Sequence, residues 1–324
     1  MPGDKILLRL STLRRNQVNL APLAKARSKT TQQWKLVQQV AEKYAPRMAK
    51  VITAAVAEIK DSVTLKEISA HLTRGDIIAA EAAIPWETIN LTKLQPAITE
   101  IFRDSMEESA QLQAELENEI FGDMRFDVTN LRAVQWARDS SSTLVREINA
   151  SQRAAIRTII TQAFEEGLHP YQSAKLIMEN VGLLNSQSQA VFRFRQQLIE
   201  AGVSIAKVNE RVERYARKLL KYRARNIART ETLRSSNMGQ HELWRQGIDN
   251  NLLTTSKIQR VWIVTPDDRL CDICAPMNGQ TVAMEEHFTG NKQNAAGVVT
   301  HLYSTLTPPI HPSCRCAIGI QRIA

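Results

Sequence analysis

The chain has 324 residues, which is enough for a substantial core and, by length alone, for about two domains. Its 43% hydrophobic and 23% charged residues are ordinary for a soluble protein, and no apolar run approaches the roughly 20 residues that span a bilayer. The N-terminus lacks the continuous apolar stretch of a secretory signal, so we expect a reducing cytoplasm, where close cysteine pairs bind metal more often than they form structural disulfides.

The first 245 residues read as helix almost throughout. Residues 1–30 are basic and weakly periodic, which indicates an N-terminal arm. Beyond them, helix-forming residues carry apolar positions three or four apart, and Gly and Pro mark the boundaries, as at Gly167 and Pro170. We predict helices near residues 31–60, 93–120, 129–165, 170–180, 187–201 and 205–246.

The last predicted helix carries most of the net charge of +9, because residues 193–234 contain 12 Lys/Arg against 4 Asp/Glu. Its expected buried stripe is Val208, Val212, Tyr215, Leu219 and Tyr222. Basic residues repeat with the same rhythm on another face, which is either a solvated surface or a contact surface for nucleic acid or an acidic protein. These residues are Arg211, Arg214, Lys218, Lys221 and Arg225.

The composition changes after Gly247. Residues 261–264 form a short β-prone run, and residues 266–268 have the composition of a turn. Residues 289–309 are polar and contain Gly and Pro, which predicts a loop. The fold class that we expect is therefore mainly α. An elongated multi-helix body spans residues 31–250, and a small α+β or irregular zinc-binding module spans residues 251–324.

All four cysteines lie in the C-terminal module, beside a histidine. Two close-set pairs of soft ligands separated by a loop suit a tetrahedral zinc ion, because each pair chelates one edge of the tetrahedron. A saturated site leaves no position for water, so the zinc would be structural rather than catalytic. Ligand type and spacing favour zinc over a disulfide or free thiols, and the lack of a βαβ pattern in the sequence disfavours a redox CxxC. His287 and His301 are expected at the surface. Five candidates compete for four positions: Cys271, Cys274, His311, Cys314 and Cys316.

Short motifs in a fixed order resemble a known family. The motifs are Arg229-Thr-Glu231-Thr, Trp244-Arg-Gln, Val261-Trp262, Asp267-Asp-Arg-Leu-Cys271-Asp-Ile-Cys274, Asn278-Gly-Gln and His311-Pro-Ser-Cys314-Arg-Cys316. In that order the chain resembles the head-morphogenesis, or minor head protein, family of tailed bacteriophages, over about residues 125–320. Many relatives have His in place of Cys274 and lack the first cysteine, so the resemblance leaves the ligand set open.

The resemblance implies a non-enzymatic virion component at the portal vertex, assembled in the host cytoplasm. Its implied roles are head assembly and the handling of packaged DNA. The implied partners are the portal protein, the major capsid or scaffolding protein and packaged DNA, with no membrane. For the motif residues Arg229 and Glu231 we favour helix caps or interdomain ion pairs over catalysis. Trp244 and Trp262 are expected as core anchors between the helical body and the zinc module.

Two other classes remain open from the residues alone. A DNA-binding zinc protein or metal-dependent nuclease would join the basic helix to the metal module and keep a water ligand on the metal. Its general base could be Glu285 or Glu286, although their spacing selects neither. A protein-modifying enzyme is the third class, and only eight residues follow Cys316 to hold an additional domain.

Overall fold

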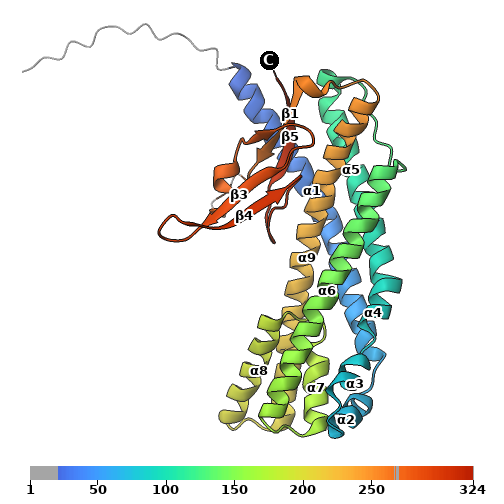
Figure 1. Ribbon diagram of the computed structural model, residues 1–324, viewed down its shortest axis with the longest axis vertical. Helices are drawn as coiled ribbons and strands as arrows, with labels where there is room; N and C mark the ends of the chain where they lie inside the picture. Colours follow the sequence, from blue (N-terminus) through green and yellow to red (C-terminus); the bar gives the residue numbers. More distant parts are fainter. Residues whose placement is uncertain (1–20, 266, 268–269, 324) are drawn as a thin grey trace, which may run out of the picture.

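The computed structural model describes residues 21–265, 267 and 270–323, and it is mainly helical with a small C-terminal strand region (Figure 1). Among these residues, no helix combines the length and the apolar composition needed to cross a membrane. The helices are α1 (Ala21–Asp61), α2 (Leu65–Thr73), α3 (Ile77–Ala82), α4 (Trp86–Ile89), α5 (Gln95–Phe121), α6 (Leu131–Glu165), α7 (Pro170–Asn180), α8 (Asn185–Glu200) and α9 (Ile205–Asp249), with a π-helical turn at Asn90–Leu94.

The long helices confirm the predicted helical segments, but three short helices were not predicted. Helices α2 and α3 begin at caps that sequence periodicity does not detect: the Thr64 hydroxyl accepts a hydrogen bond from the Glu67 N–H, and the Asp76 carboxylate accepts one from the Ala79 N–H. Gly75, at φ +71°, makes the turn between them. Helix α1 begins ten residues before the predicted boundary, and residues 1–20 of the predicted arm lie outside the described residues.

Helix α9 is the longest element, with 45 residues and a length of about 68 Å. It runs along the body beside α1 and α5, while α6, α7 and α8 surround its N-terminal half (Figure 1). The main core cluster fills this bundle, and the end of α9 passes into a second cluster shared with the C-terminal strands. One helix therefore belongs to both parts of the molecule.

Helices α5 and α9 approach closely at a glycine. A Cβ on Gly239 would lie 2.7 Å from the Cα of Met106, so only glycine allows the two backbones to touch. Beside this contact, α5 presents a fully buried polar stripe with a spacing of four residues, namely Ser105, Ser109, Gln113 and Glu117. The α9 partners are Ser235, whose hydroxyl lies 2.5 Å from Ser105 Oγ, Gln240, which donates to Gln113 at 2.9 Å, and Trp244, which donates to Glu117 at 2.9 Å.

The C-terminal strands form two small antiparallel sheets. Strand β1 (Ile258–Ile263) lies between β2 (Thr281–Val282) and β5 (Ala317–Arg322), and β3 (Phe288–Gln293) pairs with β4 (Val299–Thr305). The predicted loop at residues 289–309 is therefore wrong in its main part, because this segment forms the β3–β4 hairpin. The β-prone residues Leu302 and Tyr303 favour a strand, but the polar residues around them make the segment resemble a loop in composition.

The division into a body and a module remains a prediction. Helix α9 ends at Asp249 and β1 begins at Ile258. The two parts share core residues, since Val37 of α1 and Leu233 of α9 pack in one cluster with Ile263 of β1. The C-terminal strands therefore lie directly on the helices.

We predict that Gly239→Ala lowers the free energy of unfolding by about 2 kcal/mol or more, because the added Cβ forces the α5 and α9 backbones apart. Alanine's higher helix propensity, worth about 1 kcal/mol, acts in the opposite direction. Gly247→Ala in the same helix is the control, since its Cβ would meet only side chains of Leu253 and Met124. Urea unfolding followed by circular dichroism measures both, and equal stability of Gly239→Ala and wild type would contradict the close packing.

Candidate metal centre

Two tight turns hold the candidate ligands. In the first, the Cys274 N–H donates to Cys271 Sγ at 3.4 Å and the Ala275 N–H donates to the Cys271 carbonyl at 2.9 Å. In the second, the Cys314 N–H donates to the His311 carbonyl at 3.1 Å, and Ser313 between them adopts a left-handed conformation with φ +63°. Each turn sets two ligands side by side, as chelation of one tetrahedral edge requires.

The two turns meet, and their ligand atoms lie at metal-site distances. His311 Nε2 is 3.0 Å from Cys271 Sγ and 3.1 Å from Cys274 Sγ, and Cys274 Sγ is 3.7 Å from Cys314 Sγ. Around a tetrahedral zinc with bonds of about 2.0–2.3 Å, ligand atoms are separated by roughly 3.5–3.8 Å. Cys274, Cys314 and Cys316 form a second group whose sulfurs lie within 4.8 Å of one another. These Cys and His groups could therefore hold a metal ion.

The cluster is enclosed on one side and open on the other. Cys274, Cys314 and Cys316 are buried in the core cluster that contains Trp244 and Trp262, whereas Cys271 is half-buried. Burial of soft ligands next to aromatic side chains excludes water from one side of the cluster.

Hydrogen bonds between the buried thiols shift their pKa values in opposite directions. The thiols of Cys274 and Cys316 donate to Cys314 and lower the pKa of Cys314 to about 3. Donation to Cys314 and Cys316, together with burial, raises the pKa of Cys274 above its ordinary value. The three buried sulfurs therefore interact closely, and a cation bound there would replace their protons.

The ring of His311 has the orientation of a ligand. Its Nδ1 lies 2.9 Å from the carbonyl oxygen of Pro312, which accepts the proton that Nδ1 carries. The other ring nitrogen, Nε2, then faces the sulfurs of Cys271 and Cys274, as a metal ligand would. The surface positions predicted for His287 and His301 are confirmed, because both are exposed.

Helix α9 positions the second turn. The Ser313 N–H donates to the Thr230 hydroxyl at 3.0 Å. About two turns further along α9, the Asn237 side chain accepts from the Ile318 N–H at 2.9 Å and donates to the Cys316 carbonyl at 3.3 Å. The motif around Thr230 and the motif ending at Cys316 are thus in direct contact. Sequence analysis missed Asn237, which carries no local signal.

The other motif residues have structural surroundings. Arg229 and Glu231 lie within α9, far from either end, so the expected helix-capping role is wrong. Glu231 forms an ion pair with Arg234 at 3.0 Å, and burial raises its pKa. Trp244 and Trp262 are fully buried in the cluster that joins the helices to the strands. Pro266, Asp268 and Arg269, which belong to the predicted turn and motif, lie outside the described residues.

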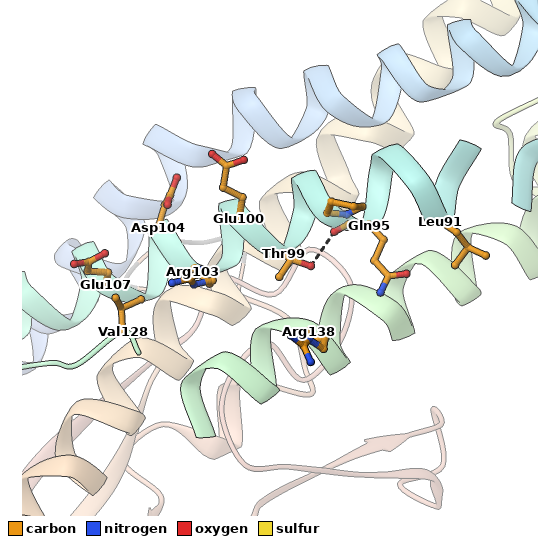
Figure 2. A pocket seen from close by; sticks show the side chains of 10 residues that line it. Leu91, Gln95, Thr99, Glu100, Arg103, Asp104, Glu107, Val128 and Arg138 are labelled. Atoms are coloured by element: carbon orange, nitrogen blue, oxygen red, sulfur yellow. Dashed lines mark hydrogen bonds between the residues drawn. The ribbon is translucent and has the colours of Figure 1, made fainter. Parts of the chain in front are cut away.

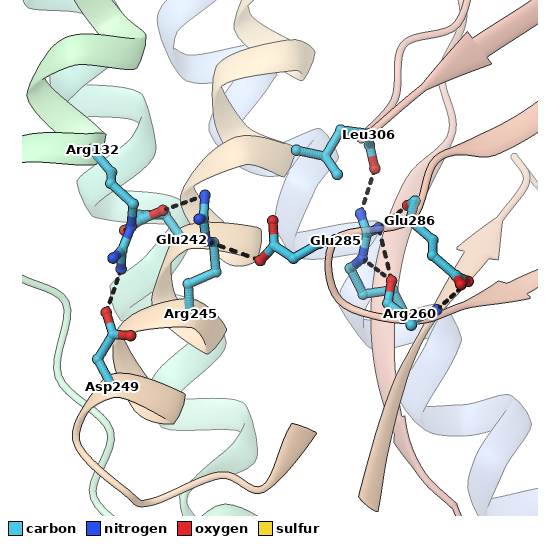
Figure 3. Close-up of polar contacts among 9 residues, drawn as sticks. Arg132, Glu242, Arg245, Asp249, Arg260, Glu285, Glu286 and Leu306 are labelled. Carbon is cyan, nitrogen blue, oxygen red and sulfur yellow. Dashed lines mark hydrogen bonds and ion pairs between the residues drawn. The ribbon is translucent and has the colours of Figure 1, made fainter. Parts of the chain in front are cut away.

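A polar network connects the helices with the strands (Figure 3). Glu242 of α9 binds Arg132 of α6 at 2.9 Å and Arg245 at 3.8 Å, and Arg245 extends to Glu285 at 3.1 Å. Arg260 of β1 is fully buried, and burial lowers its pKa to about 10.

The two glutamates considered as a general base belong to this structural network. Arg260 donates to the backbone carbonyls of Ala283, Glu286 and Leu306 (Figure 3). The Glu286 carboxylate accepts from the Ala283 N–H at 3.1 Å, and Glu285 is engaged with Arg245. Both carboxylates therefore serve the attachment of the 283–286 loop.

The basic face of α9 lies along its N-terminal half. Arg211, Lys218, Lys221 and Arg225 are exposed, and Arg214 is exposed while forming an ion pair with Glu210. This set of five is the basic stripe. In the opposite, apolar stripe Tyr222 departs from the prediction: it is 61% exposed, because the helices flanking α9 do not cover that position.

The basic stripe does not meet the cysteine cluster. Arg211 and Thr230 are nineteen residues apart on α9, or about 28 Å. Of the five, only Arg225, at the end of the basic stripe, approaches the height of the two turns that carry the candidate ligands. These two turns are called the metal loops below.

A separate groove of about 550 Å³ lies between α5 and α6 (Figure 2). Arg138 of α6 lies across it from Thr99 and Gln95 of α5. Two of its carboxylates, Glu100 and Asp104, form ion pairs with Arg47 of α1. Its lining includes neither a cysteine nor a histidine, so it offers none of the soft ligands of the cysteine cluster.

The sequence of this chain matches a known class of protein, the bacteriophage head morphogenesis proteins. The family model of phage Mu protein F-like proteins matches residues 154–319, and the chain belongs to this family. The match extends from within α6 to β5, so it includes α9 and both metal loops. The resemblance predicted from the motifs is thereby confirmed. Searches of curated proteins and of solved structures gave no match.

We predict that Cys271→Ser with Cys274→Ser abolishes metal binding and unfolds the chain after about residue 255, while the helical body stays folded, because metal binding and local folding are coupled. Elemental analysis measures the metal, and hydrogen exchange locates the unfolding. His301→Ala is the matched control, since His301 is exposed in the same module and lies outside the cluster. A double variant that keeps full metal content would rule out this centre.

Proposed function

We propose that this protein is a minor head protein of a tailed bacteriophage that joins the procapsid at the portal vertex. There it contributes to head assembly and to the handling of packaged DNA. The observation that carries the proposal is the family match, which covers the metal loops together with the helix on which they rest. The partners in this role are the portal protein and the major capsid or scaffolding protein.

The metal in this proposal is a structural zinc. Cys271, Cys274, His311 and Cys314 are the proposed ligands, since His311 Nε2 lies within 3.1 Å of two of the sulfurs and the two turns supply one chelating pair each. Cys316 then remains outside the coordination sphere as a thiol donor to the ligand sulfurs. Three thiolates and one imidazole saturate a tetrahedral zinc, so its role is to fasten the two loops.

The basic stripe is the proposed contact surface for packaged DNA. From Arg211 to Arg225 it spans about 21 Å of helix, comparable with roughly six base pairs of duplex. Its side chains are exposed to solvent, and within the described part of the chain Arg214 alone of the five forms an ion pair with a carboxylate. An exposed row of cations is suited to the phosphate backbone, without reading the base sequence.

The alternative function, a metal-dependent nuclease, requires a water ligand on the metal, a general base and a nearby DNA surface. The proposed ligand set fills all four zinc positions, and the candidate bases Glu285 and Glu286 hold the 283–286 loop. Most of the basic stripe lies nearer the N-terminus of α9 than the part of the helix that contacts the cluster. These observations favour the structural role.

We predict that the protein is found in separated phage heads and is missing from tails. Mass spectrometry of purified heads and tails measures this. A phage lacking the gene should make normal tails together with heads that assemble abnormally, or that package or deliver DNA poorly. Detection of the protein only in tails, or only as a free cytoplasmic protein, would refute the assignment.

We predict that reversing Arg211, Arg214, Lys218 and Lys221 to Glu weakens binding to duplex DNA by at least about tenfold at moderate salt, because phosphate contacts are lost and like charges are introduced. The wild-type affinity should fall steeply as salt is raised. A control that reverses Lys35, Lys50, Lys66 and Arg74 changes the net charge equally at exposed positions on α1, on α2 and at the C-cap of α2. Equal weakening by both variants would show that net charge, rather than the stripe, governs binding.

A further inference from the structure

The β3–β4 hairpin extends away from the helices (Figure 1). Within the described part of the chain, each of its strands has one hydrogen-bonded neighbour, which is the other strand of the pair. Both outer edges of the hairpin therefore carry backbone N–H and C=O groups that no further strand of the sheet satisfies.

Only the base of the hairpin is anchored. Phe288 is fully buried, and its ring packs edge-on against Trp262 with 5.2 Å between the centroids. Gly290 allows close packing against Met277, where a Cβ would lie 2.8 Å from the sulfur. No hydrophobic cluster of the described residues includes a side chain from residues 291–305.

The outer part of the hairpin exposes large apolar side chains instead. Leu302 is 77% exposed, Val298 59% and Val299 45%. A two-stranded ribbon in water is marginally stable on its own, so an extended one with apolar side chains gains stability from a partner. Protein edge strands are usually protected by several charges, and Lys292 is the only Lys, Arg, Asp or Glu within residues 288–305.

We propose that an extended backbone segment of a neighbouring head protein pairs as a strand with an outer edge of this hairpin. Leu302 and Val299 are the side-chain anchors of this contact. The proposal rests on the proposed function, because it takes the partner from the phage head. Backbone pairing supplies the affinity, and pockets for alternate side chains supply the specificity.

Charge favours a different protein over a second copy of this chain. The hairpin carries Lys292 and no Asp or Glu, and Arg315 in the second cysteine turn already pairs with Asp267. Two copies joined at their hairpins would bring two Lys292 side chains to one interface with no acidic group of the hairpin beside them, whereas a neutral or acidic segment would not. The occupant is therefore a neutral or acidic extended segment with apolar side chains.

The test is incorporation of a Val299→Lys, Leu302→Lys variant into phage heads, measured by mass spectrometry against wild type. Charges on the edge should reduce incorporation at least about tenfold, because paired edge strands do not tolerate them. Circular dichroism and metal content of the purified variant check that it is folded. Leu131→Lys is the matched control, since Leu131 is 84% exposed at the start of α6.

The outcomes separate the two proposals. Wild-type protein missing from heads would refute the proposed function itself. Wild type and variant present in heads in equal amounts would overturn the hairpin proposal and leave the function intact. A purified wild-type dimer by light scattering that becomes monomeric in the variant would also overturn it, because the occupant would then be a second copy.

Discussion

The close contact between α5 and α9 is the constraint on which the rest of the structure depends. Gly239 lets the α9 backbone lie against Met106, and the two helices are then near enough for short polar side chains to bridge them. In this register Ser105, Gln113 and Glu117 of the stripe have partners on α9, whereas Ser109 Oγ and Gln113 Nε2 have none among the described residues. A buried polar group without a partner is costly, so another register would have to replace these three pairs. Glu117 also accepts from Gln33 of α1 at 2.8 Å, which ties a third helix to the same register.

That register determines where the metal loops can form. Once α9 is fixed, Thr230 and Asn237 present a hydroxyl and an amide at the height of the second cysteine turn. The same helix carries the basic stripe in its other half, about 28 Å below Thr230 at Arg211. One helix thus sets the spacing between the candidate metal centre and the surface proposed for DNA. A separation of this kind suits a protein that bridges components of an assembly better than an enzyme, whose groups must converge on one point.

The sequence predicted what local patterns encode and missed what distant contacts create. Long helices follow from apolar periodicity, and Cys271 and Cys274 are recognisable beside each other in the chain. The short helices depend on caps at Thr64 and Asp76, whose signal is confined to a few residues. The hydrogen bond from Asn237 to the Cys316 carbonyl joins residues 79 positions apart, and no local sequence pattern around Asn237 predicts it. The prediction of a loop at residues 289–309 is wrong because, beyond Phe288 and Gly290, the two strands have no apolar face that packs on the core.

A closed metal centre is what separates a structural head protein from a metal-dependent nuclease, and X-ray absorption at the zinc edge on purified wild-type protein tests it most directly. About one zinc per chain is expected, with three sulfur ligands near ~2.3 Å and one nitrogen ligand near ~2.0 Å. A coordination sphere that contains a water oxygen would contradict the saturated site and favour catalysis. Protein without zinc after mild purification, with disulfides between Cys271, Cys274 and Cys314, would contradict the metal centre altogether.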